Sequence, residues 1–523
     1  MKAARVLVRP GSGLGEWPSA KILLGCLVGV KILIHLALSQ NYGYFRDEFY
    51  YMQLGRHVAD ASTAMPLFAP LLMALNLAVL GDSLPALHLW PALAGAGVII
   101  LAVLMVRELG GQLFAQAFAG LCVLVTPVYL AINSTFSYDS FDQLFWAAGL
   151  YVLVRLLKRN EPRLWLLFGL AAGLGLFTKE SMLFFGFGVA VAFFITPQRR
   201  YYRTKWMWLG AGVAFFFLAP YLLMQAKLHW PTLTYWGFYT QRKTYPATPP
   251  EFLWFQILAM NPLACPVWLS GLYYALRAPA GRPYRPLGWT YIFLFLLFYF
   301  LKAKFYFLAP FYPFLFAAGA VHLEQQADRR FVRVATRAWL AVILVTGGLL
   351  APFGAPLLPV ETFRKMAAAA GKLVRIEHER HKTTALPQHF ADRFGWENMA
   401  AQVAKVWRDL SPADRRQACI FTGNYGEAGA IEFFGRKLDP DLPPVISGHG
   451  QYFFWGWDGG SGELVITVGI RLVDLQRMFQ TVTAAQTIQC SYSMPYENNL
   501  TIYVCRNSVI PLPDLWPALR HFD

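Results

Sequence analysis

The stretch LPALHLWPALAGAGVIILAVLMV fills residues 84–106 without one charged side chain. At about 1.5 Å per residue, a helix of this length crosses the roughly 30 Å hydrocarbon core of a bilayer. Apolar runs of membrane length, or close to it, occur at residues 22–38, 84–106, 113–132, 141–157, 164–177, 182–195, 206–225, 252–276, 287–301, 305–321 and 338–358. The sequence therefore predicts about 11 transmembrane helices within residues 1–359.

The composition agrees with a polytopic α-helical membrane protein. Of the 523 residues, 56% are hydrophobic and only 15% are charged, and the formal net charge is +16. A soluble protein usually carries about 25% charged residues, so a purely soluble enzyme is excluded. A disordered chain is excluded as well, because it lacks the apolar content to fold. The six cysteines form no C-x-x-C pair, which argues against a structural zinc module.

The placement of positive charge predicts the orientation. With the N-terminus in the cytoplasm, 20 Lys and Arg residues fall in cytoplasmic segments and 8 in the opposite loops. Because positive residues favour the cytoplasmic side, this asymmetry predicts that the C-terminus lies outside. The short run at residues 66–80 contains Pro66 and Pro70. We interpret it as an interfacial or re-entrant helix, since a full span there would reverse every later loop.

From about residue 360 strand-like runs alternate with amphipathic helices, which predicts a soluble α/β domain at residues 360–523. The strand-like runs are Ala418–Thr422, Glu463–Val468 and Leu500–Val504, and the amphipathic stretches are Glu427–Arg436 and Leu472–Phe479. If a hairpin turned at Glu497 and Asn498, Cys490 and Cys505 would face each other. A disulfide and a pair of buried thiols both remain open for these two residues.

The first external loop reads YGYFRDEFYY at residues 42–51, so Asp47 and Glu48 lie next to each other among aromatic residues. One interpretation is an interfacial helix whose aromatic side chains anchor in the headgroup region. The other makes one of the two carboxylates a general base at a site that opens on the external face.

Further charged residues fall on the same predicted face. Asp139 follows Tyr138 at the start of one span, where a carboxylate can also cap a helix, and Lys179 lies between two short spans. More candidates are Lys302, Lys304 and Tyr306, and Arg242 with Lys243 in the loop 228–250. Lysines at helix ends often only extend to water. Together, however, carboxylates and cations on one face suit an anionic headgroup better than an ion channel.

Seven motifs follow one another along the chain: Arg46–Tyr51, the run 66–80 ending in Leu80-Gly81, Tyr138-Asp139, Gly173–Lys179, Lys302–Pro313, Asn424–Ala428 and Tyr452–Gly456. In this order they resemble the C-type glycosyltransferases (GT-C). The resemblance is to a bacterial branch of this group. That branch is akin to protein O-mannosyltransferases and the lipid A aminoarabinose transferase, and is similar to glycosyltransferase family 39. It departs at Thr63-Ala64-Met65-Pro66, where many relatives carry a His or an acidic-basic pair. The sugar and the acceptor do not follow from it.

The resemblance implies an inverting glycosyltransferase that moves a sugar from a polyprenyl-phosphate-linked donor to a hydroxyl or amine of a lipid, glycan or protein. It implies Asp47 as the catalytic base, and Asp139 with Tyr138 as a second acidic or acceptor site. Glu48 is the runner-up for the base, because the phase of the helix decides which of the two adjacent carboxylates points inward. The residues implied for donor phosphate binding are Lys179, Lys302 or Lys304, and Tyr306. Arg242 is a further candidate for the phosphate from its place in the loop 228–250. No cofactor is certain, and a divalent metal at Asp47 and Asp139 remains open. The expected location is a bacterial inner (plasma) membrane, with the C-terminal domain periplasmic or extracellular.

Two other classes of function remain open. A transporter or flippase of a lipid-linked sugar would share the spans and the interfacial cations, although the halves show no internal repeat of the kind common in transporters. A non-catalytic envelope assembly protein would tolerate the loss of Asp47. The motif G-x-x-x-x-G-K-[ST] does not occur, which excludes a P-loop nucleotide site, and nucleic acid is not an expected partner.

Overall fold

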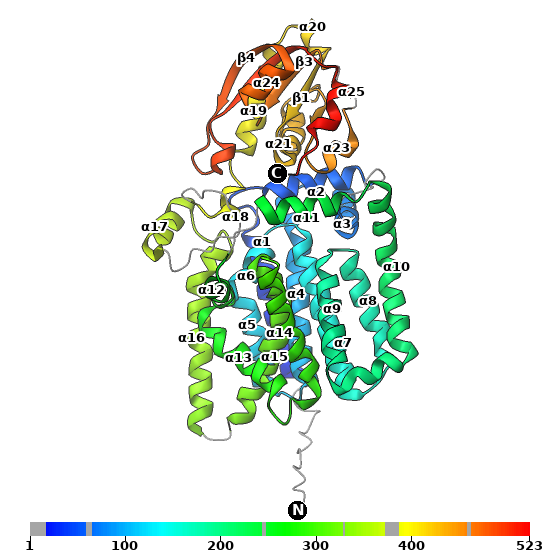
Figure 1. Cartoon of the computed structure of the whole chain (residues 1–523). Helices are drawn as coiled ribbons and strands as arrows, with labels where there is room; N and C mark the ends of the chain where they lie inside the picture. Colours follow the sequence, from blue (N-terminus) through cyan, green and yellow to red (C-terminus); the bar gives the residue numbers. More distant parts are fainter. Residues whose placement is uncertain are drawn as a thin grey trace, which may run out of the picture.

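The computed structural model describes residues 17–58, 65–242, 247–327, 330–371, 386–457 and 462–522. Figure 1 shows two parts, a bundle of helices and a smaller domain with a β-sheet at one end of it. The helices α2 (Arg46–Arg56) and α11 (Pro231–Arg242) lie where the two parts meet. This boundary contains the candidate site.

Within the described ranges, six helices are long and apolar enough to cross a membrane. They begin with α1 (Trp17–Ala37), α4 (Leu84–Glu108), α7 (Tyr138–Arg159) and α10 (Lys205–Lys227), and end with η4 (Phe305–Phe311) continuing into α15 (Tyr312–Gln326), and α16 (Arg330–Gly354). The other helices of the bundle are α3 (Phe68–Val79), α5 (Leu113–Val125), α6 (Pro127–Ile132), α8 (Leu164–Leu176), α9 (Ser181–Phe194), η1 (Pro197–Arg203), α12 (Pro249–Ala259), η2 (Pro262–Ala264), α13 (Cys265–Leu276), η3 (Arg282–Tyr284) and α14 (Arg285–Phe300). The predicted fold class, a polytopic helical membrane protein with a small α/β domain, is confirmed. The count of about 11 spans stays a prediction, since six helices of the described residues, or eight spans if each bent helix pair counts as one, are long and apolar enough.

Two predicted spans are broken helices rather than continuous ones. The run 113–132 divides into α5 and α6 at Thr126, because a residue that precedes proline avoids the helical conformation. The run 252–276 divides at Asn261-Pro262, where α12 and the following segment meet at 95°. In both places the proline lacks an N–H and begins a new helix at its first turn. Hydropathy alone does not detect such breaks.

The run 66–80 forms the single short helix α3, in line with the interfacial interpretation of that segment. At 12 residues, α3 is too short to cross a bilayer core. The departure from the family pattern at Thr63 and Ala64 lies outside the described residues.

The C-terminal domain contains a five-stranded sheet of order β2-β1-β3-β5-β4. Its strands are β1 (Ala418–Thr422), β2 (Val445–Ser447), β3 (Leu464–Val468), β4 (Phe479–Ile488) and β5 (Leu500–Ser508). The strands β2, β1 and β3 are parallel, whereas β5 is antiparallel to β3 and β4. The helices of this part are α17 (Val360–Ala370), α18 (Gln388–Ala391), α19 (Trp396–Asp409), α20 (Pro412–Arg415), α21 (Tyr425–Ala430), η6 (Ile431–Gly435), α22 (Arg436–Leu438), α23 (Gln451–Trp455), α24 (Leu472–Met478), η7 (Pro495–Glu497), α25 (Leu512–Leu515) and η8 (Trp516–Leu519).

The predicted strands β1, β3 and β5 are confirmed, but the predicted hairpin turn at Glu497 and Asn498 is wrong. The hairpin pairs β4 with β5, so that Ile488 faces Leu500 and Val482 faces Cys505. Cys490 lies in the connection between these strands. The six cysteines, all within the described residues, are free thiols, so Cys490 and Cys505 form no disulfide. The mostly polar strand β4 lacks the apolar run by which β1, β3 and β5 were predicted, and the three-residue strand β2 is too short to show one.

Candidate active site

The start of α2 places Asp47 and Glu48 in different environments. The backbone of Phe45 is extended, and the Glu48 carboxylate accepts the Phe45 N–H at 2.8 Å, as in a capping box. The N–H of Arg46 donates to the carbonyl of Asp392, in the C-terminal domain, at 2.9 Å. The helix is therefore fixed from both sides, with Glu48 turned inward and Asp47 turned outward.

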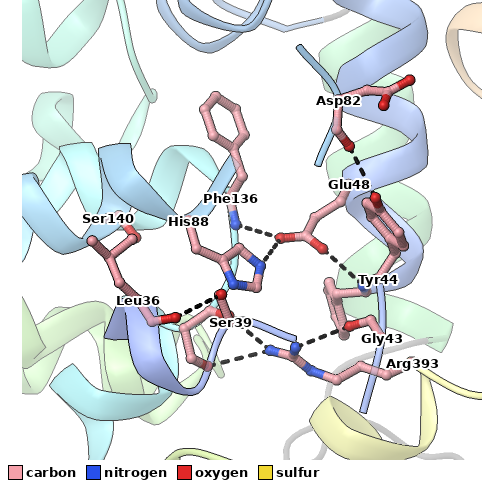
Figure 2. Close-up of polar contacts among 12 residues, drawn as sticks. Leu36, Ser39, Gly43, Tyr44, Glu48, Asp82, His88, Phe136, Ser140 and Arg393 are labelled. Carbon is pink, nitrogen blue, oxygen red and sulfur yellow. Dashed lines mark hydrogen bonds and ion pairs between the residues drawn. The ribbon is translucent and has the colours of Figure 1, made fainter. Parts of the chain in front are cut away.

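Figure 2 shows the surroundings of Glu48, which is fully buried. Its carboxylate accepts the backbone N–H of Phe136 at 2.8 Å and lies 2.8 Å from Nε2 of His88. Arg393, held by the carbonyls of Ser134 and Gly43, adds a positive charge nearby. Burial alone would raise the pKa of Glu48, but His88, Arg393 and the hydrogen bonds outweigh it and hold that pKa below its ordinary value. Glu48 is thus a buried anchor with its oxygens engaged.

Asp47 has the exposure that Glu48 lacks. About a third of its side chain, 35%, is accessible. One carboxylate oxygen, Oδ1, accepts a hydrogen bond from the Tyr425 hydroxyl at 2.7 Å and lies 3.5 Å from Nε of Arg46. An accessible carboxylate held by two neighbours can accept a proton from a bound molecule. Glu48 cannot do so, because its side chain is fully buried.

Tyr425 comes from the C-terminal domain, at the turn between β1 and α21. The Asn424 side chain caps α21 by accepting the N–H groups of Gly426 and Glu427 at 2.8 and 3.0 Å. The Tyr425 ring then packs against that of Tyr50, with 4.5 Å between centroids. The Arg46 guanidinium lies 5.6 Å from the Tyr425 ring centroid. The domain therefore contributes a hydroxyl directly to the Asp47 site.

Buried carboxyl groups hold the turn that carries Tyr425. Glu427 accepts the N–H groups of Gly423 and Asn424, and the Asn424 amide donates to Glu497 at 2.9 Å. Burial raises the pKa of Glu427 from 4.5 to about 7. Burial, together with the charge of Glu427, also holds the pKa of Glu497 well above its ordinary value.

We therefore expect the thermal stability of the C-terminal domain to fall as the pH rises from about 4.5 to about 7. A carboxyl whose pKa is higher in the folded state keeps its proton there, so its contribution is full below the unfolded pKa and is lost as the pH passes the folded one. Melting curves at several pH values check this, and Glu427→Gln should flatten the dependence. The exposed Glu397→Gln should leave it unchanged; equal slopes in wild type and Glu427→Gln would contradict the assignment.

A second polar cluster lies at the start of α7. The Lys179 ammonium donates to Asp139 Oδ1 at 2.5 Å, and both residues are mostly buried. Two aromatic rings flank the ammonium, Tyr138 at 4.8 Å and Phe307 at 4.4 Å from their centroids. The pocket next to this pair is lined by Ile132, Asp139, Asp142, Gln143, Lys179, Tyr306, Phe307 and Pro310. A cation in a pocket with aromatic walls is suited to bind an anionic group.

Tyr51 connects the two clusters. Burial raises its pKa well above the ordinary value, and the negative charges of both Asp47 and Asp139 act in the same direction. The Tyr51 hydroxyl also accepts the N–H of Tyr138 at 3.3 Å. Asp47 and Asp139, with its partner Lys179, therefore both lie near Tyr51, at the same end of the bundle.

The other cations predicted for the site differ in position. Lys304 precedes η4, and its ammonium lies 5.2 Å from the Tyr239 ring centroid of α11 and 5.8 Å from that of Tyr306. Lys302 is exposed in the turn after α14, with a positive φ of 52°. Arg242 ends α11 but its side chain, like all of Lys243, lies outside the described residues. The structure thus brings Lys179 and Tyr306 into one pocket and places Lys304 beside Tyr306.

The carboxylates named for a metal are held by other groups. Asp47 is engaged by Tyr425 and Arg46, and Asp139 by the Lys179 ammonium. Among the described residues, no three His, Cys, Asp or Glu side chains are grouped in a way that could hold a metal ion. An ammonium within hydrogen-bond distance of Asp139 disfavours a second cation there, so the residues present do not fit a divalent metal.

The sequence analysis assigned no role to several residues that the structure places in the site. They are His88 and Arg393 around Glu48, Tyr425 beside Asp47, and Asp142 and Gln143 in the pocket. The positions of Asp142 and Gln143 offer a signal, because residues three and four after Asp139 share its helix face. For Tyr425 and Arg393, which lie more than 300 residues from α2, sequence spacing offers none.

Comparison with known proteins points to the same class as the sequence motifs, the C-type glycosyltransferases. Residues 64–224 match the family described as dolichyl-phosphate-mannose-protein mannosyltransferase. The crystal structure of ArnT from Cupriavidus metallidurans bound to undecaprenyl phosphate is similar to this chain, with a TM-score of 0.58 at 15% identity over 93% of this chain and 98% of that one. Its apo structure gives a TM-score of 0.57 at 14% identity over the same shares. A search of curated proteins found no match.

The fold is that of the C-type membrane glycosyltransferases, and the resemblance inferred from the motifs is confirmed. The partial family match and the fold thus both point to glycosyltransferases as the proteins to which this chain is similar.

Proposed function

We propose that this chain is an inverting glycosyltransferase that moves a sugar from a polyprenyl-phosphate carrier to a hydroxyl or amine acceptor. The observation that carries the proposal is the pair of clusters near Tyr51: an accessible carboxylate, Asp47, and a cation in a pocket, Lys179. The ArnT structure with undecaprenyl phosphate supports a lipid-phosphate donor for this fold. The positive charge asymmetry supports a site on the external face. The change from long apolar helices to short helices and strands after α16 supports a boundary near residue 360 between the membrane part and an external domain.

The reaction needs few groups, because a sugar 1-phosphate already carries a good leaving group. The acceptor oxygen or nitrogen attacks C1 of the sugar while the bond from C1 to the phosphate oxygen breaks, which inverts the configuration at C1. The electron pair of that bond moves to the phosphate, and Lys179 stabilises the charge that develops there. Tyr306 lines the same pocket and is placed to donate to a phosphate oxygen.

Asp47 is the base in this mechanism. It takes the acceptor proton as the new bond forms, while Tyr425 and Arg46 hold its carboxylate in place. Acceptor and donor would meet near Tyr51, which lies within electrostatic reach of both Asp47 and Asp139.

Lys179→Ala is expected to lower kcat/KM for the lipid-linked donor roughly 10- to 150-fold, because the phosphate loses a charge-assisted contact of about 1.5–3 kcal/mol. Steady-state kinetics with the purified chain measure this. Lys158→Ala is the matched control, since Lys158 is paired with Glu108 at an exposed position and does not line the pocket. If Lys179→Ala and Lys158→Ala both kept wild-type kinetics, the phosphate would bind elsewhere.

Tyr425→Phe removes only the hydroxyl that reaches Asp47 and is expected to lower kcat about 10-fold, with donor affinity unchanged. Tyr50→Phe is its control, because the Tyr50 hydroxyl accepts the Gln451 N–H at the same interface without contacting Asp47. The control should lose thermal stability and keep most of its kcat. Equal losses of kcat in both variants would assign Tyr425 to domain packing instead.

A further inference from the structure

We propose that Asp142 and Gln143 bind ring hydroxyl groups of the donor sugar, and so select the sugar. This inference rests on the proposed function, and it deepens it by assigning a sugar subsite in the pocket that contains Lys179. Both residues line the pocket that contains Lys179, and both are nearly inaccessible, at 4% and 1% exposure.

The side-chain amide of Gln143 is the strongest sign of a missing ligand. Neither its oxygen nor its nitrogen has a hydrogen-bond partner among the described residues. Buried polar groups are nearly always paired, and an unpaired one costs stability. A glutamine that lines a pocket, with both ends of its amide unpaired by protein groups, is available to a bound molecule.

The chemistry of the amide separates the sugar from the phosphate. A phosphate oxygen only accepts hydrogen bonds, so it would pair the NH2 group of Gln143 and leave the carbonyl oxygen without a donor. A sugar hydroxyl both donates and accepts, and two neighbouring hydroxyls can satisfy both ends of the amide. The unpaired carbonyl oxygen therefore favours a hydroxyl-bearing ring.

Asp142 provides an acceptor next to this amide. The Ser181 hydroxyl donates to its Oδ1 at 2.6 Å, which fixes the carboxylate at the first turn of α9. A carboxylate and an amide side by side are a donor and acceptor set that suits vicinal hydroxyls.

The geometry of α7 places the proposed sugar-binding residues next to the proposed phosphate-binding residue. Asp139, Asp142 and Gln143 lie on one face of α7, and Lys179 contacts the first of them. With the phosphate at Lys179, the attached sugar would reach Asp142 and Gln143 one helical turn away, in the same pocket.

The test uses the full chain purified in detergent, with undecaprenyl phosphate and a panel of undecaprenyl-phosphate hexoses that differ in the configuration of their hydroxyls. Affinities are measured by the shift of the melting temperature with ligand concentration. The wild type is expected to bind at least one hexose-linked carrier 10-fold or more tightly than the bare carrier. Gln143→Leu should abolish that preference, keep the affinity for bare undecaprenyl phosphate, and melt at a higher temperature without ligand, because it removes an unpaired amide.

Gln116→Leu is the matched control. Gln116 is also a buried glutamine with an unpaired oxygen among the described residues, but it does not line the pocket. It should keep the sugar preference. If Gln143→Leu failed to fold, Asp142→Asn would serve, with the same loss of preference expected.

The other outcomes separate the inference from the proposed function. Full sugar preference in both pocket variants overturns the inference, and so does a wild type that binds every carrier equally. Loss of affinity for bare undecaprenyl phosphate in Gln143→Leu assigns the amide to the phosphate, which also overturns it. A wild type that binds none of these lipids contradicts the proposed function itself.

Discussion

Asp47→Asn is expected to lower the rate of sugar transfer by about 10²–10⁴, the usual effect of removing a general base. The amide keeps the size of the side chain and can still accept the Tyr425 hydroxyl, so the fold should survive. It has no basic oxygen for the acceptor proton. Affinity for undecaprenyl phosphate should be unchanged, because the carboxylate serves the acceptor and not the donor.

Asp82→Asn is the matched control for this variant. Asp82 has a similar exposure, 36%. It pairs with Arg56, the last residue of α2, and with Lys437 of α22. It should keep full activity. An Asp47→Asn variant with wild-type transfer would remove the proposed base, whereas a loss of donor affinity would assign Asp47 to the donor.

Glu48→Ala is expected to destabilise the protein by roughly 3–5 kcal/mol, the usual cost of removing one partner from buried groups of opposite charge, here the Glu48 carboxylate near Arg393. The substitution leaves His88 and the N–H groups of Phe45 and Phe136 without their acceptor, next to the positive charge of Arg393. Thermal unfolding measures the loss. Transfer should fall in parallel with the amount of folded protein.

Glu48→Gln separates the two roles that the sequence left open for Glu48. Its amide oxygen can still accept backbone N–H groups, so its stability should be closer to wild type than that of Glu48→Ala. If this variant folded with wild-type stability and had no activity, Glu48 rather than Asp47 would be the base. Wild-type turnover per folded molecule agrees with a structural anchor.

Hydropathy and charge were sufficient to predict the class of fold, because a bilayer imposes long apolar helices on any sequence that crosses it. Hydropathy and charge were not sufficient to predict where the membrane helices break. The prolines at Pro127 and Pro262 divide two predicted spans, and the polar strand β4 has no apolar run to mark it. The failed hairpin at Glu497 followed directly from missing β4, since the partner of β5 was absent from the prediction.

The sequence identified the residue types of the site better than their roles. Asp47 and Glu48 are adjacent in sequence, and only the capping geometry of Phe45 turns one inward and the other outward. Tyr425 reaches Asp47 from the C-terminal domain, a contact that depends on how the two parts dock. Gln143 has no distinctive motif, and its unpaired amide becomes visible only in three dimensions.

The most direct measurement is the release of undecaprenyl phosphate from an undecaprenyl-phosphate-linked sugar. Membranes that contain the full chain supply the acceptor, and mass spectrometry follows the lipid. With the sugar that this chain accepts, bare undecaprenyl phosphate and a glycosylated product should appear together in wild-type membranes. With Asp47→Asn, the rate of their appearance should be lower by a factor of about 10² or more. Intact donor with every sugar of the panel, or equal release by wild type and Asp47→Asn, would contradict the account.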